Sequence, residues 1–184
     1  MQKSELNKAL ICGYAAIYSS QSTPIKNFVE VFMPGAFDEA LRNQTDCQIN
    51  LNHEQKRHLG KVSSGQLKLE ADSTGLWFEL RPTDQFGRDY FESIRRGDYT
   101  ECSVSFTVEK NGAELQRTNE KDIFLRKIYA VKKLHDISVV ANPAYPGTSI
   151  FWVNDRSDLE LLKRCRVKGQ LTALQASTKD FFTK

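Results

Sequence analysis

Short runs of alternating or β-branched apolar residues recur along the first 140 residues, as expected for strands with one buried face. Two stretches have helix-like spacing instead. Residues 34–41 carry an early proline, and a second helix is capped by Thr83 or Asp84 and ends before Gly97. The pattern predicts an α+β fold, mostly antiparallel β, with two or three helices. The expected strands are residues 9–18, 47–51, 60–70, 75–81, 102–109, 123–132 and 136–140.

The C-terminal part of the chain has a different pattern. Asn111-Gly112 between two β-type runs predicts a hairpin turn. The strand pattern stops after residues 142–147, which hold two prolines and a glycine, and a third helix is expected over residues 157–176. We therefore expect one domain over residues 1–154 and a basic, helical tail over residues 155–184.

Composition narrows the class of protein. A chain of 184 residues with 40% hydrophobic and 27% charged residues can form a globular domain. Its apolar runs are too short to cross a bilayer, and its first residues do not resemble a secretion signal, so we expect a cytosolic protein. Seven basic and four acidic residues in the tail account for the whole net charge of +3, which is too small to indicate nucleic-acid binding. The four cysteines lack zinc-site spacing and are expected to be free thiols.

Candidate chemistry comes from one histidine and one strand. His53 follows a β-type run, where a strand meets a loop and could present an imidazole over a cleft. In the run 102–108, Ser103 and Ser105 share one face while Val104 and Phe106 share the other. A nucleophilic serine needs such exposure and a nearby imidazole, but a solvated strand face has the same pattern. These residues alone favour a surface loop and a polar strand face over a catalytic site.

Five short blocks occur in a characteristic order between residues 10 and 150. They are Gly13-Tyr14-Ala15-Ala16, the run 33–41, Asn52-His53-Glu54, Leu59-Gly60-Lys61-Val62, and the run 136–148 that begins Asp-Ile-Ser-Val-Val. In this order and spacing they resemble the prohead (capsid maturation) serine protease family of tailed bacteriophages. The helix ending at Gly97 also precedes the serine strand, as it does in that family.

The resemblance implies a catalytic triad. Ser103 falls on the serine of the family pattern Met-Ser-Phe-Gly-Phe and would be the nucleophile, with His53 as the base. Ser105 replaces the glycine of that pattern and shares the face of Ser103, so it is a rival nucleophile. Asp136 aligns with the acidic residue of the closing block and would orient His53.

The third member of the triad has a rival as well. Assemblin-type enzymes use a histidine there, and His135 adjoins Asp136. The two side chains should point to opposite faces of an extended strand. Regular alternation would place His135 with Ile137 and Val139, nearer the core, which favours Asp136.

The resemblance further implies a herpesvirus-assemblin-like β-barrel flanked by helices and a serine endopeptidase without metal or organic cofactor. Its substrates and partners would be the scaffold protein and the major capsid protein, cut inside the assembling prohead in the cytoplasm of the bacterial host. The resemblance leaves room for self-association, and requires neither nucleic acid nor membrane. The tail would be removed by self-cleavage or would dock the enzyme in the shell.

Two other classes compete with this interpretation. One is a capsid-assembly or scaffold module that keeps the fold without activity, although the presence of Ser103, His53 and Asp136 argues against it. The other is a cysteine hydrolase that uses Cys102. Strand alternation turns Cys102 away from the face of Ser103, so the two residues cannot serve the same cleft.

Overall fold

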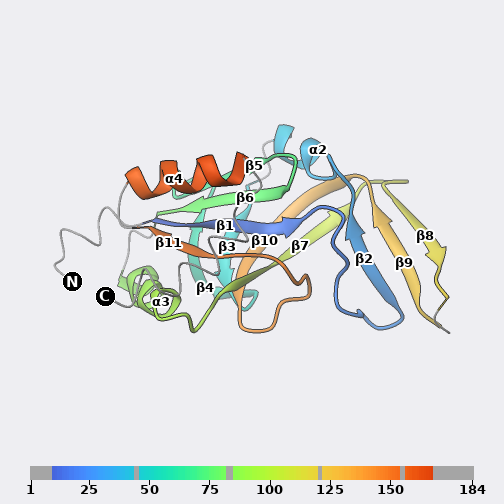
Figure 1. Ribbon diagram of the computed structural model, residues 1–184, viewed down its shortest axis with the longest axis horizontal. Coiled ribbons are helices and arrows are strands. Elements are labelled where there is room, and N and C mark those ends of the chain that lie inside the picture. Colours follow the sequence, from blue (N-terminus) through green and yellow to red (C-terminus); the bar gives the residue numbers. More distant parts are fainter. Residues whose placement is uncertain (1–9, 44–45, 82–84, 120–121, 154–155, 168–184) are drawn as a thin grey trace.

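The computed structural model describes residues 10–43, 46–81, 85–119, 122–153 and 156–167 (Figure 1). Its helices are α2 (Asp38–Arg42), α3 (Gln85–Arg95) and α4 (Arg156–Val167). Its strands are β1 (Leu10–Ile17), β2 (Phe28–Phe32), β3 (Gln48–Leu51), β4 (Glu54–Lys61), β5 (Leu67–Ala71), β6 (Gly75–Leu80), β7 (Glu101–Val108), β8 (Ala113–Arg117), β9 (Phe124–Ile128), β10 (Val131–Val140) and β11 (Phe151–Val153).

These strands form three sheets. Two have four strands each, in the orders β11-β1-β6-β5 and β4-β3-β10-β7, and the third has the order β2-β9-β8. All pairs are antiparallel except β3 with β10 and β2 with β9. The three-stranded sheet lies at the opposite end of the molecule from α3 and α4 (Figure 1). The predicted α+β class with mostly antiparallel strands is confirmed, whereas the described strands remain three open sheets and do not close into the expected barrel.

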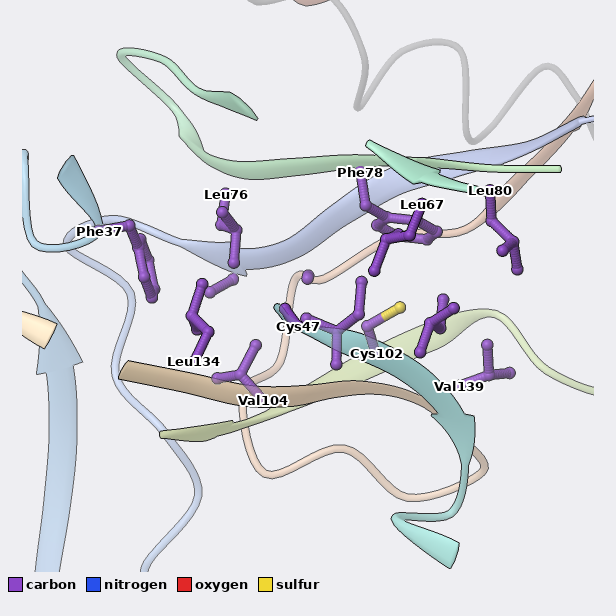
Figure 2. Close-up of a cluster of buried hydrophobic side chains, with 14 of the residues drawn as sticks. Phe37, Cys47, Leu67, Leu76, Phe78, Leu80, Cys102, Val104, Leu134 and Val139 are labelled. Carbon is purple, nitrogen blue, oxygen red and sulfur yellow. The ribbon is translucent and has the colours of Figure 1, made fainter. Parts of the chain in front are cut away.

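The main core lies between the two four-stranded sheets. Leu76, Phe78 and Leu80 of β6 point toward Cys102 and Val104 of β7 (Figure 2). Apolar residues on alternate positions of β7 and β10 thus face the first sheet, which leaves the polar positions of the same strands on the opposite face. The fold therefore separates a packed face from a face that can carry chemistry.

Several predicted elements differ from those in the structure. The expected strand 60–70 is the end of β4, a turn and β5, because Ser63, Ser64 and Gly65 interrupt it. The expected strand 123–132 is also split, between β9 and β10. Asn111 does adopt a turn conformation, with φ 63°. The strands on either side of it, β7 and β8, belong to different sheets, so the predicted hairpin is wrong.

Strands whose sequence does not alternate were missed. They include β2, the polar β4, and β11, which follows the point where the strand pattern was expected to stop. The helix expected over residues 34–41 is the shorter α2, preceded by a turn, and the second helix is α3. The caps proposed at Thr83 and Asp84 lie outside the described residues, as does the third helix after Val167.

The first part of the expected tail packs on the domain. Leu159 and Leu162 of α4 are buried in a second apolar cluster with Tyr14 and Trp77. Lys163 Nζ lies 2.9 Å from Glu79 Oε1, at the same surface. The division of the chain at residue 154 stays a prediction, and α4 contributes to the structure on the C-terminal side of it.

Phe32 of β2 packs against Phe106 of β7, so its truncation tests the contact between their two sheets. Its fully buried ring contacts Phe37, Phe106 and Tyr145, with ring centroids 4.8, 5.1 and 5.0 Å away. Because truncation leaves a cavity among these rings, Phe32→Ala should lower the free energy of unfolding by about 3–5 kcal/mol in a denaturant titration.

The matched control for that titration is Leu115→Ala, at a side chain that is 60% exposed on β8. It should change the same free energy by no more than about 0.5 kcal/mol. Equal effects of the two substitutions would show that Phe32 does not join the sheets.

Candidate active site

His53 is held in a two-residue turn between β3 and β4. Leu51 pairs with Glu54, and both turn residues, Asn52 and His53, have positive φ, at 50° and 59°. This is the conformation of the tight hairpin turns that match strand twist, and Asn and His are enriched in it among residues other than glycine. The Asn52 backbone N–H donates to the Val139 carbonyl at 2.9 Å. The turn is therefore attached to β10.

This attachment brings His53 to Asp136. His53 Nδ1 lies 2.7 Å from Asp136 Oδ1. An ionised carboxylate only accepts hydrogen bonds, so Nδ1 carries the proton, and Nε2 of the neutral ring is left as the basic nitrogen. The His53 side chain is 37% exposed while that of Asp136 is 13% exposed. The pair thus has a buried acceptor and an imidazole that solvent and a substrate can reach.

A β-bulge in β10 decides which of the two adjacent candidates faces His53. Leu134 pairs with Phe106 and Asp136 pairs with Ser105, so His135 is an extra residue on this strand. His135 is exposed, and its Nε2 lies 2.7 Å from Thr107 Oγ1. The expectation that alternation places His135 nearer the core is wrong, because the bulge breaks the alternation. The preferred residue, Asp136, is nevertheless the one that contacts His53.

The two serines of β7 lie beside this pair. Ser103 is directly opposite Ser138 on β10, and Ser105 is directly opposite Asp136. Directly opposed side chains of an antiparallel pair share one face of the sheet, so both hydroxyls are on the face of Asp136. Ser103 is only 6% exposed, whereas Ser105 is half-buried. No serine among the described residues is hydrogen-bonded to the His53 ring, and catalytic hydrogen bonds are often long before substrate binds.

Ser138 is a part of the site that sequence reasoning missed. Its hydroxyl donates to Asp136 Oδ1 at 2.7 Å and accepts the His53 backbone N–H at 3.1 Å. The side chain is fully buried. The available signal was its position two residues after Asp136, on the same face of a strand.

A cavity of about 780 Å³ opens beside the His53–Asp136 pair. Ser105 and Phe106 of β7 line it on one side and Phe28 of β2 on another, while Ser103 is not part of the lining. The cavity is large enough to take substrate side chains next to His53.

A part-buried ion pair lies in the lining of this cavity. The Glu30 carboxylate accepts a hydrogen bond from Arg126 Nη1 at 2.6 Å and another from the Tyr145 hydroxyl. Burial is the largest reason why the pKa of Tyr145 is raised, and the neighbouring Glu30 raises it further. These contacts join β2, β9 and the segment after β10 at the cavity lining. The sequence analysis did not single out these residues.

Cys102 lies on the other face of β7, as alternation predicts. It is fully buried in the main core (Figure 2). Burial raises the pKa of its thiol far above the ordinary range, and also raises that of Cys47 to about 12. Neither buried thiol has the thiolate character or the access that a nucleophile requires.

In the described ranges, no three or more His, Cys, Asp and Glu side chains are grouped so that they could hold a metal ion. Over those same residues, no helix combines the length and apolarity needed to cross a membrane.

An imidazole that is hydrogen-bonded to a buried carboxylate, beside serine hydroxyls and an open cavity, defines a serine-hydrolase type of site. The particular family follows from the sequence match. The chain belongs to the family described as caudovirus prohead serine protease, which it matches over residues 1–163. It is therefore a serine peptidase of the phage capsid-maturation class. Among curated proteins, none is a significant match to this chain.

Herpesvirus proteases are among the solved structures to which the chain is similar. One is Kaposi's sarcoma-associated herpesvirus protease in complex with a hexapeptide phosphonate inhibitor, at 11% identity and a TM-score of 0.49, covering 80% of this chain and 65% of that one. The same viral protease with an allosteric inhibitor has 11% identity and a TM-score of 0.49, covering 90% of each chain. Varicella-zoster virus protease has 16% identity and a TM-score of 0.41, covering 78% and 63%.

Thiol alkylation tests the assignment of the cysteines. Because Cys47 and Cys102 are buried and their pKa values are raised, iodoacetamide should modify neither in the folded chain and should leave peptidase activity unchanged. Both should react in guanidinium chloride, as read by peptide mass mapping. Rapid modification of Cys102 in the folded chain with loss of activity would instead support the cysteine hydrolase.

Proposed function

We propose that this chain is an endopeptidase that cleaves scaffold protein, or the scaffold segment of the major capsid protein, during capsid maturation. Its triad is Ser103, His53 and Asp136. The observation that carries the proposal is the hydrogen bond of 2.7 Å between His53 Nδ1 and Asp136 Oδ1, on the sheet face that holds Ser103. Membership of the prohead protease family supports the substrate class.

The reaction follows from the protonation of this pair. Ser103 Oγ attacks the scissile carbonyl carbon while His53 Nε2 accepts the hydroxyl proton, and Asp136 stabilises the imidazolium through Nδ1–H. The C–N bond then breaks as Nε2 returns the proton to the leaving amine, which leaves an acyl-enzyme. Water attacks the ester in the same way, and its proton passes through Nε2 to Ser103 Oγ. Backbone amides would stabilise the oxyanion formed in each half.

Ser103 is preferred to Ser105 on family register. It occupies the serine of the family pattern, while Ser105 occupies the glycine. Ser103 also lies opposite Ser138, whose hydroxyl contacts both other members of the proposed triad. The feature that supports Ser105 is its place in the cavity lining, next to His53 and Asp136. Ser105 is therefore the direct competitor in the first experiment below.

The enzyme would work in the cytoplasm of the bacterial host, inside the assembling prohead, on capsid and scaffold proteins. Self-cleavage in the region after residue 154 belongs to this proposal. A catalytically inactive assembly module is the competing function, and the contact of His53 with Asp136 counts against it. Such a module would have no reason to keep an imidazole bonded to a buried carboxylate.

The first prediction concerns the nucleophile. Ser103→Ala should abolish cleavage of a peptide library read by mass spectrometry, and of the chain's own tail read by intact mass. Ser105→Ala should retain substantial activity. Losing a nucleophile removes most of the rate enhancement, because only binding and oxyanion contributions remain. Normal cleavage by Ser103→Ala together with an inactive Ser105→Ala would transfer the role to Ser105.

The second prediction concerns His53 and its partner. Because the imidazole must be neutral to accept a proton, kcat/KM should fall on the acid side of neutrality, and His53→Ala should be inactive. Asp136→Asn should lower kcat far more than His135→Gln, since Asp136 contacts His53 Nδ1 and His135 contacts Thr107. Circular dichroism should show both variants folded. An inactive His135→Gln beside an active Asp136→Asn would make this a Ser-His-His enzyme.

A further inference from the structure

One buried hydroxyl connects the two parts of the site that come from distant segments of the chain. Ser138 Oγ donates to Asp136 Oδ1, the same oxygen that accepts from His53 Nδ1, and both distances are 2.7 Å. The same hydroxyl oxygen accepts the backbone N–H of His53 at 3.1 Å. One hydroxyl therefore donates to the carboxylate and accepts from the turn that carries the imidazole.

Ser138 has none of the access that a nucleophile needs. It is fully buried, it lies in the middle of its sheet between β3 and β7, and its single proton is already donated to Asp136. Its neighbours in register are Asn50 on β3 and Ser103 on β7. Ser138 therefore lies between β3, which leads into the His53 turn, and β7, which carries Ser103.

We propose that Ser138 is a positioning residue, whose hydroxyl fixes the Asp136 carboxylate and the His53 turn relative to each other. This inference rests on the proposed function, because it assigns a role toward the His53–Asp136 pair. The hydroxyl restricts Asp136 to the orientation that meets Nδ1, and it restricts the turn at the residue that carries the ring. Both restrictions act in the free enzyme, before substrate binds.

The hydroxyl also adjusts the charge of the carboxylate. A hydrogen bond donated to Asp136 Oδ1 spreads its negative charge and weakens its hold on an imidazolium. When the hydroxyl is removed, the remaining hydrogen bond from His53 to Asp136 becomes stronger than it is in the parent chain. The cationic ring is then favoured, so the acid limb of the pH–rate profile should move to higher pH.

Steady-state kinetics of Ser138→Ala test the proposal, on a peptide selected from the library and over about pH 5 to 9, where histidine titrates. We expect kcat to fall by about tenfold or more with little change in KM, because the loss is of alignment and not of substrate contacts. We also expect the midpoint of the acid limb to rise. Unchanged kcat and an unmoved acid limb would overturn the proposal.

Ser149→Ala is the matched control. Ser149 is also buried, and its hydroxyl also accepts a backbone N–H, from Tyr14 at 3.2 Å, without contact to Asp136 or His53. The control should keep the parent acid limb even if its stability falls. An equal shift of the acid limb in both variants would show a general structural effect and overturn the proposal.

A second pair of variants separates the hydroxyl from its packing. Ser138→Thr keeps the hydroxyl and Ser138→Val replaces it with a methyl group of similar size, so both impose the same steric load. When each variant is assayed at the same interval below its own melting temperature, the threonine variant should have a clearly higher kcat than the valine variant. Equal kcat values would overturn the proposal, even if Ser138→Ala fails to fold.

The same assays distinguish failure of this inference from failure of the proposed function. If the parent chain cleaves peptides and Ser103→Ala does not, but Ser138→Ala matches the parent, the inference alone is wrong. If the parent cleaves nothing, or if the Ser103→Ala, Ser105→Ala and His53→Ala variants all cleave like the parent, both are wrong.

Discussion

The attachment of the β3–β4 turn to β10 is the interaction on which the site depends. It consists of two backbone donors, from Asn52 to the Val139 carbonyl and from His53 to the Ser138 hydroxyl. Because β3 runs parallel to β10, this turn leaves the sheet next to the strand that carries Asp136. Without these contacts the turn would be held to β10 only through the pairing of β3. With them, Nδ1 is held at the carboxylate, and Nε2 is left for the proposed role as the base.

The sheet containing β7 and β10 keeps its two functions on opposite faces. Cys102 and Val104 face the main core, whereas Ser103 and Ser105 share the face of Asp136. A shift of one residue in register would exchange these faces and would place a hydroxyl in the core. The core therefore determines the register, and the register determines which hydroxyls share the face of Asp136.

The sequence was informative wherever alternation was regular and uninformative where it was not. The strand around Ser103 and the exclusion of Cys102 followed from alternation alone, and the His53–Asp136 contact followed from the family resemblance. The bulge at His135 could not be predicted, because an extra residue in one strand is set by pairing with the other. Ser138 was missed for a related reason, since its importance lies in contacts with a turn 85 positions away in the chain.

The central claim is that His53 and Asp136 activate Ser103 on their shared sheet face. The most direct measurement is labelling with a serine-directed peptidyl phosphonate, read by peptide mass mapping, in the parent chain and in His53→Ala. The account predicts one adduct per chain, on Ser103, and little or none in His53→Ala. An adduct on Ser105 or Cys102, or equal labelling of Ser103 without His53, would contradict it.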